Sequence, residues 1–381
     1  MTKEKDCFGS GETDIARYFA KASASRIPLA ASFELTRRCS FRCVHCYLGD
    51  QKSIRKYQDR ELETKTVFRL LDEMVEAGTL FLLLTGGDPM LRPDFVEIYK
   101  YAVRAGLLVT VFCNGSLVSD EIVRAFVEYP PRIVEITVYG ATQETFEAVT
   151  QQPGSFSACM IGIERLRSAG VRLRLKTMVL TLNVDEFPAI RQLAMDLDLP
   201  FRHDCSLHAA IAHEDNNGRS NIGTAESSLT DPLRYRLASE QAAAVDLSID
   251  NLAHELAEAI EKACPKESTE QLYYCGAGKS SYHVTPYGKL HPCLAVQSHS
   301  FDVNRQGGVQ AGWNGVLRDF TSCRASDSFS CNYCRNREVC TACPAVFAAV
   351  SGDPEQVDTF YCRYAEKRRD NILAFRRKHS G

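Results

Sequence analysis

The sequence has no long hydrophobic run, little excess of charge of either sign and only one tryptophan. Its longest apolar segments have the length of a strand, well short of the roughly 20 residues that a membrane helix needs. Residues 1–14 are polar and lack the apolar stretch of a secretory signal. The net charge is −3 and no long basic run is present, which argues against nucleic-acid binding. We therefore expect a cytoplasmic protein that binds neither nucleic acid nor membrane.

Cysteine, in contrast, is abundant, with 16 residues in the chain. The cytoplasm keeps thiols reduced, so disulfides are a poor explanation for this number and metal binding is a better one. Three cysteines lie within residues 39–46, and most of the others lie between residues 275 and 362. This clustering supports metal binding.

The order of apolar and amphipathic segments predicts the fold class. From residue 31 to about residue 205, strand-like runs alternate with helical patterns, which indicates a parallel sheet with right-handed crossovers. We predict an α/β protein with a partial (β/α)6 TIM-like barrel and a small cysteine-rich iron–sulfur domain at the C-terminal end. The expected domains are an N-terminal extension (1–30), the barrel (31–212), a linker with bridging helices (213–270) and the C-terminal domain (271–381).

The first cysteine cluster follows the first predicted strand directly. Cys39, Cys43 and Cys46 have the spacing C-x3-C-x2-C. Three thiolates on one loop can bind three irons of a 4Fe–4S cube and leave the fourth iron without a protein ligand. An open position of this kind is what catalysis at a metal requires. The alternative is a zinc site with His45 as the fourth ligand.

The three-cysteine pattern resembles the signature of the radical S-adenosylmethionine (SAM) superfamily. The resemblance implies that the open iron binds the amino and carboxylate groups of SAM. It also implies that an electron from the cluster splits SAM into methionine and a 5′-deoxyadenosyl radical, which abstracts a hydrogen atom from the substrate.

Further segments of the barrel resemble the SAM-binding motifs of this superfamily. Gly86, Gly87 and Asp88 follow the second predicted strand, where the superfamily has a Gly-Gly-Glu-Pro type of turn, so Asp88 replaces the commoner glutamate. By the same resemblance Asn114 and Thr137, at the ends of the third and fourth strands, are candidate SAM contacts. Asn114 could equally be a turn residue.

The fifth predicted strand carries cations at alternate positions. Arg172, Arg174 and Lys176 share one face and could line the barrel interior. Lys176 is a candidate for holding the SAM carboxylate or an acidic substrate, and a strand residue that extends its amine to water is the alternative. His203, His208 and His213 follow the sixth strand region, and no role is assigned to them.

The cysteines after residue 270 resemble the SPASM domain, which adds two auxiliary clusters to many radical SAM enzymes. The resemblance assigns one 4Fe–4S cluster to Cys331, Cys334, Cys340 and Cys362. It assigns the other to Cys275, Cys293 and Cys343, with Cys264, Cys323 or no residue as the fourth ligand. The two residues between Cys340 and Cys343 are one fewer than is usual in the family. A zinc ribbon of Cys331, Cys334, Cys340 and Cys343 is the alternative, but it leaves Cys275, Cys293 and Cys362 unexplained.

Auxiliary clusters favour an oxidative reaction, because a radical left on the substrate must then lose an electron. We expect a radical SAM oxidoreductase that modifies or crosslinks a ribosomally made peptide, with radical tailoring of a small molecule such as a modified tetrapyrrole as the alternative. The roughly thirty residues before the barrel are too few for a leader-peptide recognition domain, so either a separate recognition protein or leader-independent binding is expected. A reductant such as flavodoxin or ferredoxin is also expected. An alternative of another class is a zinc-stapled binding module.

Overall fold

The structure is a computed structural model, and it describes residues 14–210, 213–214, 220–221, 231–248, 254, 256–258, 260 and 270–379. The chain divides into two compact units, which are taken one at a time. Unit 1 comprises the described residues of 1–21, 237–275 and 322–381, and unit 2 comprises those of 22–236 and 276–321. Among the described residues, no helix combines the length and the apolar character that spanning a bilayer requires.

Unit 2 contains a nine-stranded sheet in the order β11-β10-β9-β1-β2-β3-β4-β5-β6. The strands are β1 (Ala30–Thr36), β2 (Phe81–Gly86), β3 (Leu108–Cys113), β4 (Ile133–Thr137), β5 (Leu173–Met178), β6 (Phe201–Asp204), β9 (Ser281–Val284), β10 (Lys289–His291) and β11 (Phe301–Asp302). Strands β1 to β6 are parallel and lie beside one another in chain order, as expected for a partial barrel. The predicted fold class is confirmed, and the barrel is not closed.

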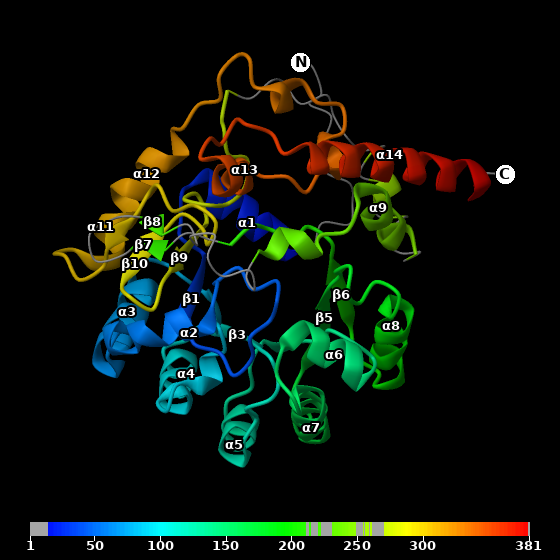
Figure 1. The fold of residues 1–381 in the computed structure, drawn as a ribbon. Helices are drawn as coiled ribbons and strands as arrows, with labels where there is room; N and C mark the ends of the chain where they lie inside the picture. Colours follow the sequence, from blue (N-terminus) through cyan, green and yellow to red (C-terminus); the bar gives the residue numbers. More distant parts are fainter. Residues whose placement is uncertain are drawn as a thin grey trace. The chain divides into compact units, whose positions relative to one another are not determined.

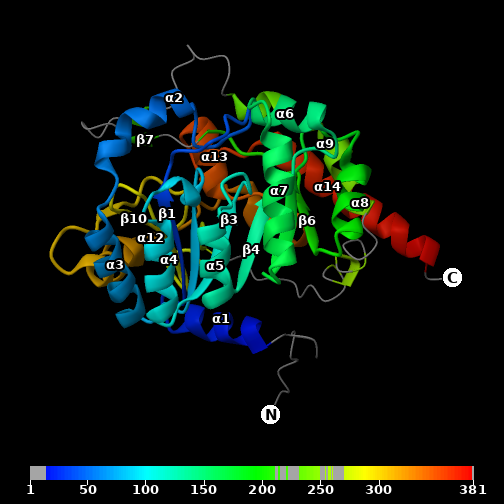
Figure 2. The same cartoon turned by 90° about the horizontal axis from the view of Figure 1, so that it is seen from below.

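Helices connect the parallel strands on one side of this sheet (Figure 1). They are α2 (Gln51–Ile54), α3 (Thr64–Glu76), α4 (Phe95–Arg104), α5 (Asp120–Glu128), α6 (Gln143–Thr150), α7 (Ser155–Ser168) and α8 (Phe187–Asp196), with 3₁₀ segments η1 (Arg55–Arg60) and η2 (Pro89–Leu91). Viewed from below, α3, α4, α5, α7 and α8 follow one another around the strands (Figure 2).

Side chains alternate between the two faces of each strand, and the two faces differ in chemistry. Val111 of β3, Ile136 of β4 and Leu175 of β5 are at most 1% exposed and belong to one apolar core with residues of α3, α4, α5 and α7. Their neighbours Phe112, Glu135 and the cations of β5 therefore point to the other face, the barrel interior. The interior is thus polar where the outer face is apolar.

Strands from residues 281–302 extend the barrel sheet, a feature that was not predicted from the sequence. β9 pairs in parallel with β1, with Ala30 opposite Ser281 and Phe33 opposite Val284. The antiparallel strands β10 and β11 then complete this edge. Residues 276–321 consequently belong to the same compact unit as the barrel, although the predicted C-terminal domain includes them. The domain boundaries remain a prediction.

The remaining elements are divided between the two units. In unit 1 they are α9 (Ser239–Leu247), α13 (Pro344–Ser351), α14 (Thr359–His379), η4 (Ser330–Tyr333) and η5 (Arg337–Val339). Helices α11 (Gly308–Asn314) and α12 (Val316–Thr321), 3₁₀ segment η3 (Pro232–Tyr235) and the strand pair β7 (His213–Glu214) and β8 (Ser220–Asn221) belong to unit 2, and α1 (Asp14–Ala24) precedes β1.

Candidate active site

Cys39, Cys43 and Cys46 lie on the loop that leaves the C-terminal end of β1. Their sulfurs are close enough to interact electrostatically, and burial raises the pKa of Cys39 to about 12 and that of Cys46 to about 11. Three neighbouring, partly buried thiols cannot all ionise without a compensating positive charge. Bound irons would supply that charge, so the donor set fits a metal cluster.

Gln51 binds the backbone of this loop, and Glu61 binds the side chain of Arg38 just before it. The Gln51 amide accepts a hydrogen bond from Cys39 N (2.8 Å) and donates one to the Arg37 carbonyl oxygen (3.1 Å). The Glu61 carboxylate accepts two hydrogen bonds from the Arg38 guanidinium, at 3.0 and 2.9 Å. Gln51 and Glu61 follow the three cysteines closely in the sequence, but the cysteine spacing does not indicate that they contact the loop.

A buried ion pair lies beneath the loop. The Glu34 side chain is fully buried, and its carboxylate accepts a hydrogen bond from Arg37 Nε at 2.9 Å. Burial alone would raise the pKa of Glu34, but Arg37 and His283 outweigh it and hold this pKa at about 2. Tyr47, just after Cys46, also donates to Glu34. The segment that carries the cysteines is thus anchored to β1 by charge as well as by backbone contacts.

Gly86 and Gly87 bring the end of β2 against the same loop. Gly87 N donates to the Thr36 carbonyl oxygen, and Asp88 N donates to the Arg38 carbonyl oxygen, both at 2.9 Å. A methyl group on Gly87 would overlap with the carbonyl oxygens of Arg37 and Arg38. In the structure, these glycines therefore allow the end of β2 to approach the cysteine loop closely. That they also bind SAM remains a prediction.

We expect Gly87→Ala to prevent the loop from holding its cluster. The added methyl group collides with backbone, which cannot swing aside as a side chain can. Iron analysis after anaerobic reconstitution should show a loss of about four irons per chain. Gly170→Ala is the control, because its methyl group meets no atom within 4 Å and only the positive φ is strained. Full iron in Gly87→Ala would contradict this role.

Asp88 and Asn114 join the ends of β2 and β3 to the cysteine loop. The Asp88 carboxylate accepts hydrogen bonds from Met90 N (2.9 Å) and Asn114 N (3.0 Å), and burial raises its pKa to about 6. Asn114 Nδ2 donates to Ser40 Oγ at 2.9 Å and lies 3.5 Å from Cys39 Sγ. Both side chains thus support the loop, and their predicted contacts with SAM remain predictions.

Tyr139 is a site residue that was not singled out from the sequence. It donates a hydrogen bond to Cys43, and its ring lies against His45 with centroids 4.9 Å apart. Asn183 Nδ2 donates to the Tyr139 carbonyl oxygen at 3.0 Å and so fixes this backbone. The alternation of side chains along a strand could have indicated this residue, because Tyr139 shares a face with Thr137 at the end of β4.

We expect Tyr139→Phe to shift the reduction potential of the bound cluster to a more negative value. Hydrogen bonds to cluster sulfurs stabilise the reduced state, and this substitution removes one of them without removing the ring. A redox titration followed by electron paramagnetic resonance measures the shift. Tyr101→Phe is the matched control, since the Tyr101 hydroxyl contacts Asp72 on the exposed surface. Equal potentials in the two variants would contradict the prediction.

The family model described as the radical SAM superfamily matches residues 33–194, which run from β1 through α8 and include all three loop cysteines. The chain carries a radical SAM domain. A 4Fe–4S cluster and SAM are implied by this family, and the loop geometry fits the cluster.

Two relatives match the radical SAM chain over most of its length. The AdoMet-dependent heme synthase of Methanosarcina barkeri is 26% identical over 355 residues, which cover 88% of this chain and 97% of that protein. The PqqA peptide cyclase of Ruegeria pomeroyi is 24% identical over 350 residues, which cover 87% of this chain and 86% of that protein. Both matches extend beyond the radical SAM domain into the cysteine-rich region.

Solved structures share the fold. Native anSMEcpe with bound AdoMet has a TM-score of 0.68 at 13% identity and covers 91% of this chain and 98% of its own. Streptococcus suis SuiB bound to S-adenosylmethionine has a TM-score of 0.63 at 13% identity and covers 94% of this chain and 83% of its own. At this identity the likeness concerns the fold alone.

Beyond the radical SAM domain, four cysteines of unit 1 lie close enough to interact, and their role as ligands of one cluster remains a prediction. Cys331 interacts electrostatically with Cys334, Cys340 and Cys362, and burial raises its pKa to about 11. The fourth of these, Cys362, is on α14, whereas the others lie around η4 and η5.

The second predicted set is divided between the two units. Cys343 interacts electrostatically with Cys275 in unit 1, while Cys293 follows β10 in unit 2. Of the suggested fourth ligands, Cys323 accepts a backbone hydrogen bond from Leu272 N through its carbonyl oxygen, and Cys264 lies outside the described residues. This ligand set remains a prediction.

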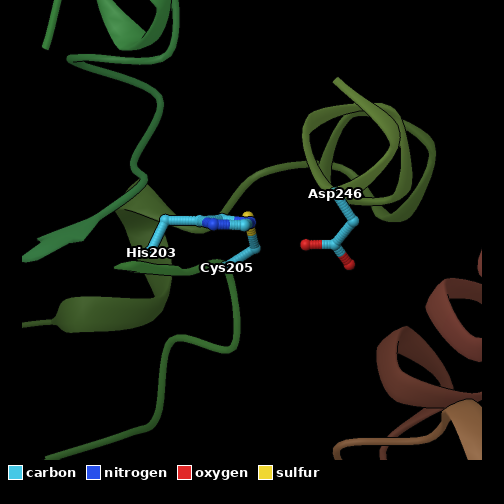
Figure 3. Close-up of side chains that lie close together, drawn as sticks. All are labelled: His203, Cys205 and Asp246. Carbon is cyan, nitrogen blue, oxygen red and sulfur yellow. The ribbon is translucent and has the colours of Figure 1, made fainter. Parts of the chain in front are cut away.

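His203 and Cys205 lie on and just after β6 of unit 2 and point to the same side (Figure 3). Asp246, the third residue labelled there, belongs to α9 of unit 1. His208 is half-buried, and its partial removal from water lowers its pKa, while the side chain of His213 lies outside the described part of the chain. No role in the radical SAM site follows for these residues.

Proposed function

We propose that this radical SAM enzyme abstracts a hydrogen atom from a ribosomally made peptide and thereby starts an oxidative modification or crosslink. The loop of Cys39, Cys43 and Cys46 carries the proposal, because three thiols leave one corner of a cube for SAM. The match to a peptide cyclase over 87% of the chain supports a peptide as substrate.

When bound, the cluster supplies the electron that cleaves SAM to methionine and the 5′-deoxyadenosyl radical. The protein's own part is to hold SAM and to keep it oriented toward the barrel interior. For that role we propose the polar groups at the ends of the parallel strands, which are Gly86, Gly87, Asp88, Asn114, Thr137 and Lys176. Thr137 is the last residue of β4, and Lys176 is its partner on β5.

An oxidative modification of the substrate releases an electron that another group must accept. Abstraction of one hydrogen atom leaves a carbon radical, and forming a new bond to a second group then releases one proton and one electron. We propose that the C-terminal cysteines hold two auxiliary 4Fe–4S clusters that accept this electron. Cys331, Cys334, Cys340 and Cys362 would hold one cluster, and Cys275, Cys293 and Cys343 the other. A flavodoxin or ferredoxin would supply the first electron, and a separate protein would present the leader peptide.

A second candidate substrate is a modified tetrapyrrole. It is favoured by the match to an AdoMet-dependent heme synthase, which covers 97% of that protein. The radical chemistry and the proposed clusters are the same for both substrates, so the two candidates differ in what the barrel interior binds.

Metal analysis and product analysis test the proposal in two steps. Anaerobically purified protein should contain roughly twelve irons with matching sulfide, whereas zinc without sulfide would support a binding module instead. The protein is then incubated with SAM, a strong reductant and either a peptide encoded beside its gene or an iron porphyrin. We expect deoxyadenosine together with a mass change in the peptide. A mass change in the porphyrin alone would favour the second candidate, and no deoxyadenosine in either arm would refute both.

A further inference from the structure

Strands β4, β5 and β6 place four charged side chains on the interior face of the barrel. Glu135 pairs with Arg174, and Lys176 pairs with Arg202, so all four share one face of the sheet. This face is the one turned away from the helices, because the alternate residues of β4 and β5 belong to the apolar core.

The cluster contains more positive than negative charge. Glu135 Oε1 lies 3.2 Å from Arg174 Nη1, while Oε2 lies 2.6 Å from Arg202 Nη2 and 3.8 Å from Lys176 Nζ. Three cations thus share one carboxylate. Asp204, two residues after Arg202, lies on the same face, but its carboxylate accepts a hydrogen bond from Ser206 N at 2.7 Å. Within the described chain, Glu135 alone is ion-paired with these cations.

The arginines are held in place yet remain accessible. The Glu135 side chain is 6% exposed, whereas those of Arg174 and Arg202 are 40% and 45% exposed. Arg174 gives Glu135 one N–H and Arg202 gives it two, out of five on each guanidinium. Several donors of two converging guanidinium groups are therefore left for a ligand, and planar forks of this kind match a carboxylate.

An aromatic ring forms one side of this cluster. Lys176 Nζ lies 3.1 Å from the centroid of the Phe112 ring, and Arg202 Cζ lies 5.6 Å from it. Burial, with the nearby Arg202, lowers the pKa of Lys176 to about 7, although Glu135 opposes this shift. The environment is thus short of negative charge, and an added anion would stabilise the charged amine.

The cluster spans two levels of the barrel interior. Thr137, Lys176 and Arg202 are register partners on β4, β5 and β6, toward the edge where the cysteine loop lies. Glu135 and Arg174 are two residues closer to the other edge, which is about 6.6 Å at the rise of a parallel strand. Glu135 contacts the guanidinium groups of both levels and so holds Arg174 and Arg202 together below Thr137.

We propose that Arg174 and Arg202, positioned by Glu135, bind a carboxylate group of the substrate within the barrel. The inference rests on the proposed function and extends it, since it assigns an acidic substrate to this enzyme. The carboxylate can come from an acidic side chain of a peptide or from a small polycarboxylate.

Binding is measured by calorimetry on the full-length, cluster-reconstituted protein without SAM or reductant. One arm uses glutarate and its neutral diamide, and the other uses a blocked pentapeptide with a central glutamate and the same peptide with glutamine. We expect a carboxylate probe to bind and its neutral counterpart not to bind. The arm with the tighter carboxylate probe identifies the source.

Variants then locate the binding. Losing one charged donor should raise the Kd about tenfold in Arg174→Gln and in Arg202→Gln. Arg202→Lys should recover part of the affinity, because it keeps the charge. Arg167→Gln is the matched control, as Arg167 is 44% exposed on the outer helix α7 and pairs with Glu164. It should leave the Kd unchanged.

Equal affinity for charged and neutral probes, or unchanged affinity in Arg174→Gln and Arg202→Gln, would overturn this site. Because no radical is generated in these measurements, their failure is separate from failure of the proposed function. The latter would show as an absence of deoxyadenosine when SAM and reductant are added.

Discussion

Replacement of Cys39, Cys43 or Cys46 by alanine is expected to abolish SAM cleavage and to remove about four of the roughly twelve irons. Each of these thiols binds a different corner of the proposed cube, so two remaining thiols cannot hold it in its open form. Gln51 and Glu61 cannot take the place of a thiol, because they already bind the backbone of the loop and the neighbouring Arg38. The C-terminal cysteines are not part of this loop, and their irons should stay.

Deoxyadenosine formation and iron content together check this expectation. Deoxyadenosine should fall to the background in all three variants, while the iron that remains should be about eight per chain. Cys159→Ala is the control, because Cys159 is a fully buried cysteine of the barrel core and no metal role is expected for it. A Cys43→Ala protein that still cleaved SAM would show that the three thiols are not the cluster ligands.

Much of this site could be predicted because its signals are local. The spacing of Cys39, Cys43 and Cys46 is contained in eight consecutive residues. The order of strands and helices can likewise be predicted from the local pattern of apolar and polar residues. Parallel strands in chain order then bring their C-terminal ends to one edge, which is how Gly86, Asn114 and Thr137 come to lie near the cysteine loop.

The remaining features depend on contacts between distant parts of the chain. The pairing of β9 with β1 joins residues about 250 positions apart, and no local pattern indicates which strand edge is free. The hydrogen bond from Tyr139 to Cys43 likewise requires knowledge of how the loop crosses the barrel edge. Gly86 and Gly87 were predicted to matter, but the group that they approach, the backbone of residues 36–38, is visible only in the structure.

Charge in the barrel interior was predicted in part. Strand alternation correctly placed Arg174 and Lys176 on one face of β5, and Glu135 with Thr137 on one face of β4. The contact of both Arg174 and Arg202 with Glu135 could not be predicted, because it depends on the register of β4, β5 and β6, which cannot be read from the sequence. The candidate anion site follows from that register.

Replacement of Cys331 or Cys334 by alanine is expected to destabilise unit 1 and leave the radical SAM loop loaded. The buried apolar side chains around α14 include Ala257, Val339, Ala365 and Ile372. Polar contacts add to them, since Asp246 on α9 accepts a hydrogen bond from Tyr364 at 2.6 Å. Metal bound by the cysteines of this unit would contribute to its folding free energy, so loss of a cluster should destabilise the unit.

The structure indicates how the loss of metal would spread through unit 1. Cys362 is on α14, and Arg368 of the same helix donates to the Val339 carbonyl oxygen at 2.9 Å, next to Cys340. A cluster shared by Cys331, Cys334, Cys340 and Cys362 would therefore tie α14 to the η4–η5 segment. Without the cluster, that connection keeps the packing of Val339 against α14 and a few polar contacts, so the segment should open more often and become accessible to protease.

Limited proteolysis with mass analysis measures this opening, and iron analysis measures the cluster. Cys331→Ala and Cys334→Ala should be cleaved within residues 322–381 at least tenfold faster than the wild type, which corresponds to a loss of about 1.4 kcal/mol against local opening. Iron should fall from about twelve to about eight per chain, with deoxyadenosine formation without substrate retained. Ser330→Ala, an exposed neighbour of Cys331, is the control. Because the loop cysteines are untouched in these variants, wild-type protease resistance together with full iron would mean that Cys331 and Cys334 do not hold a cluster.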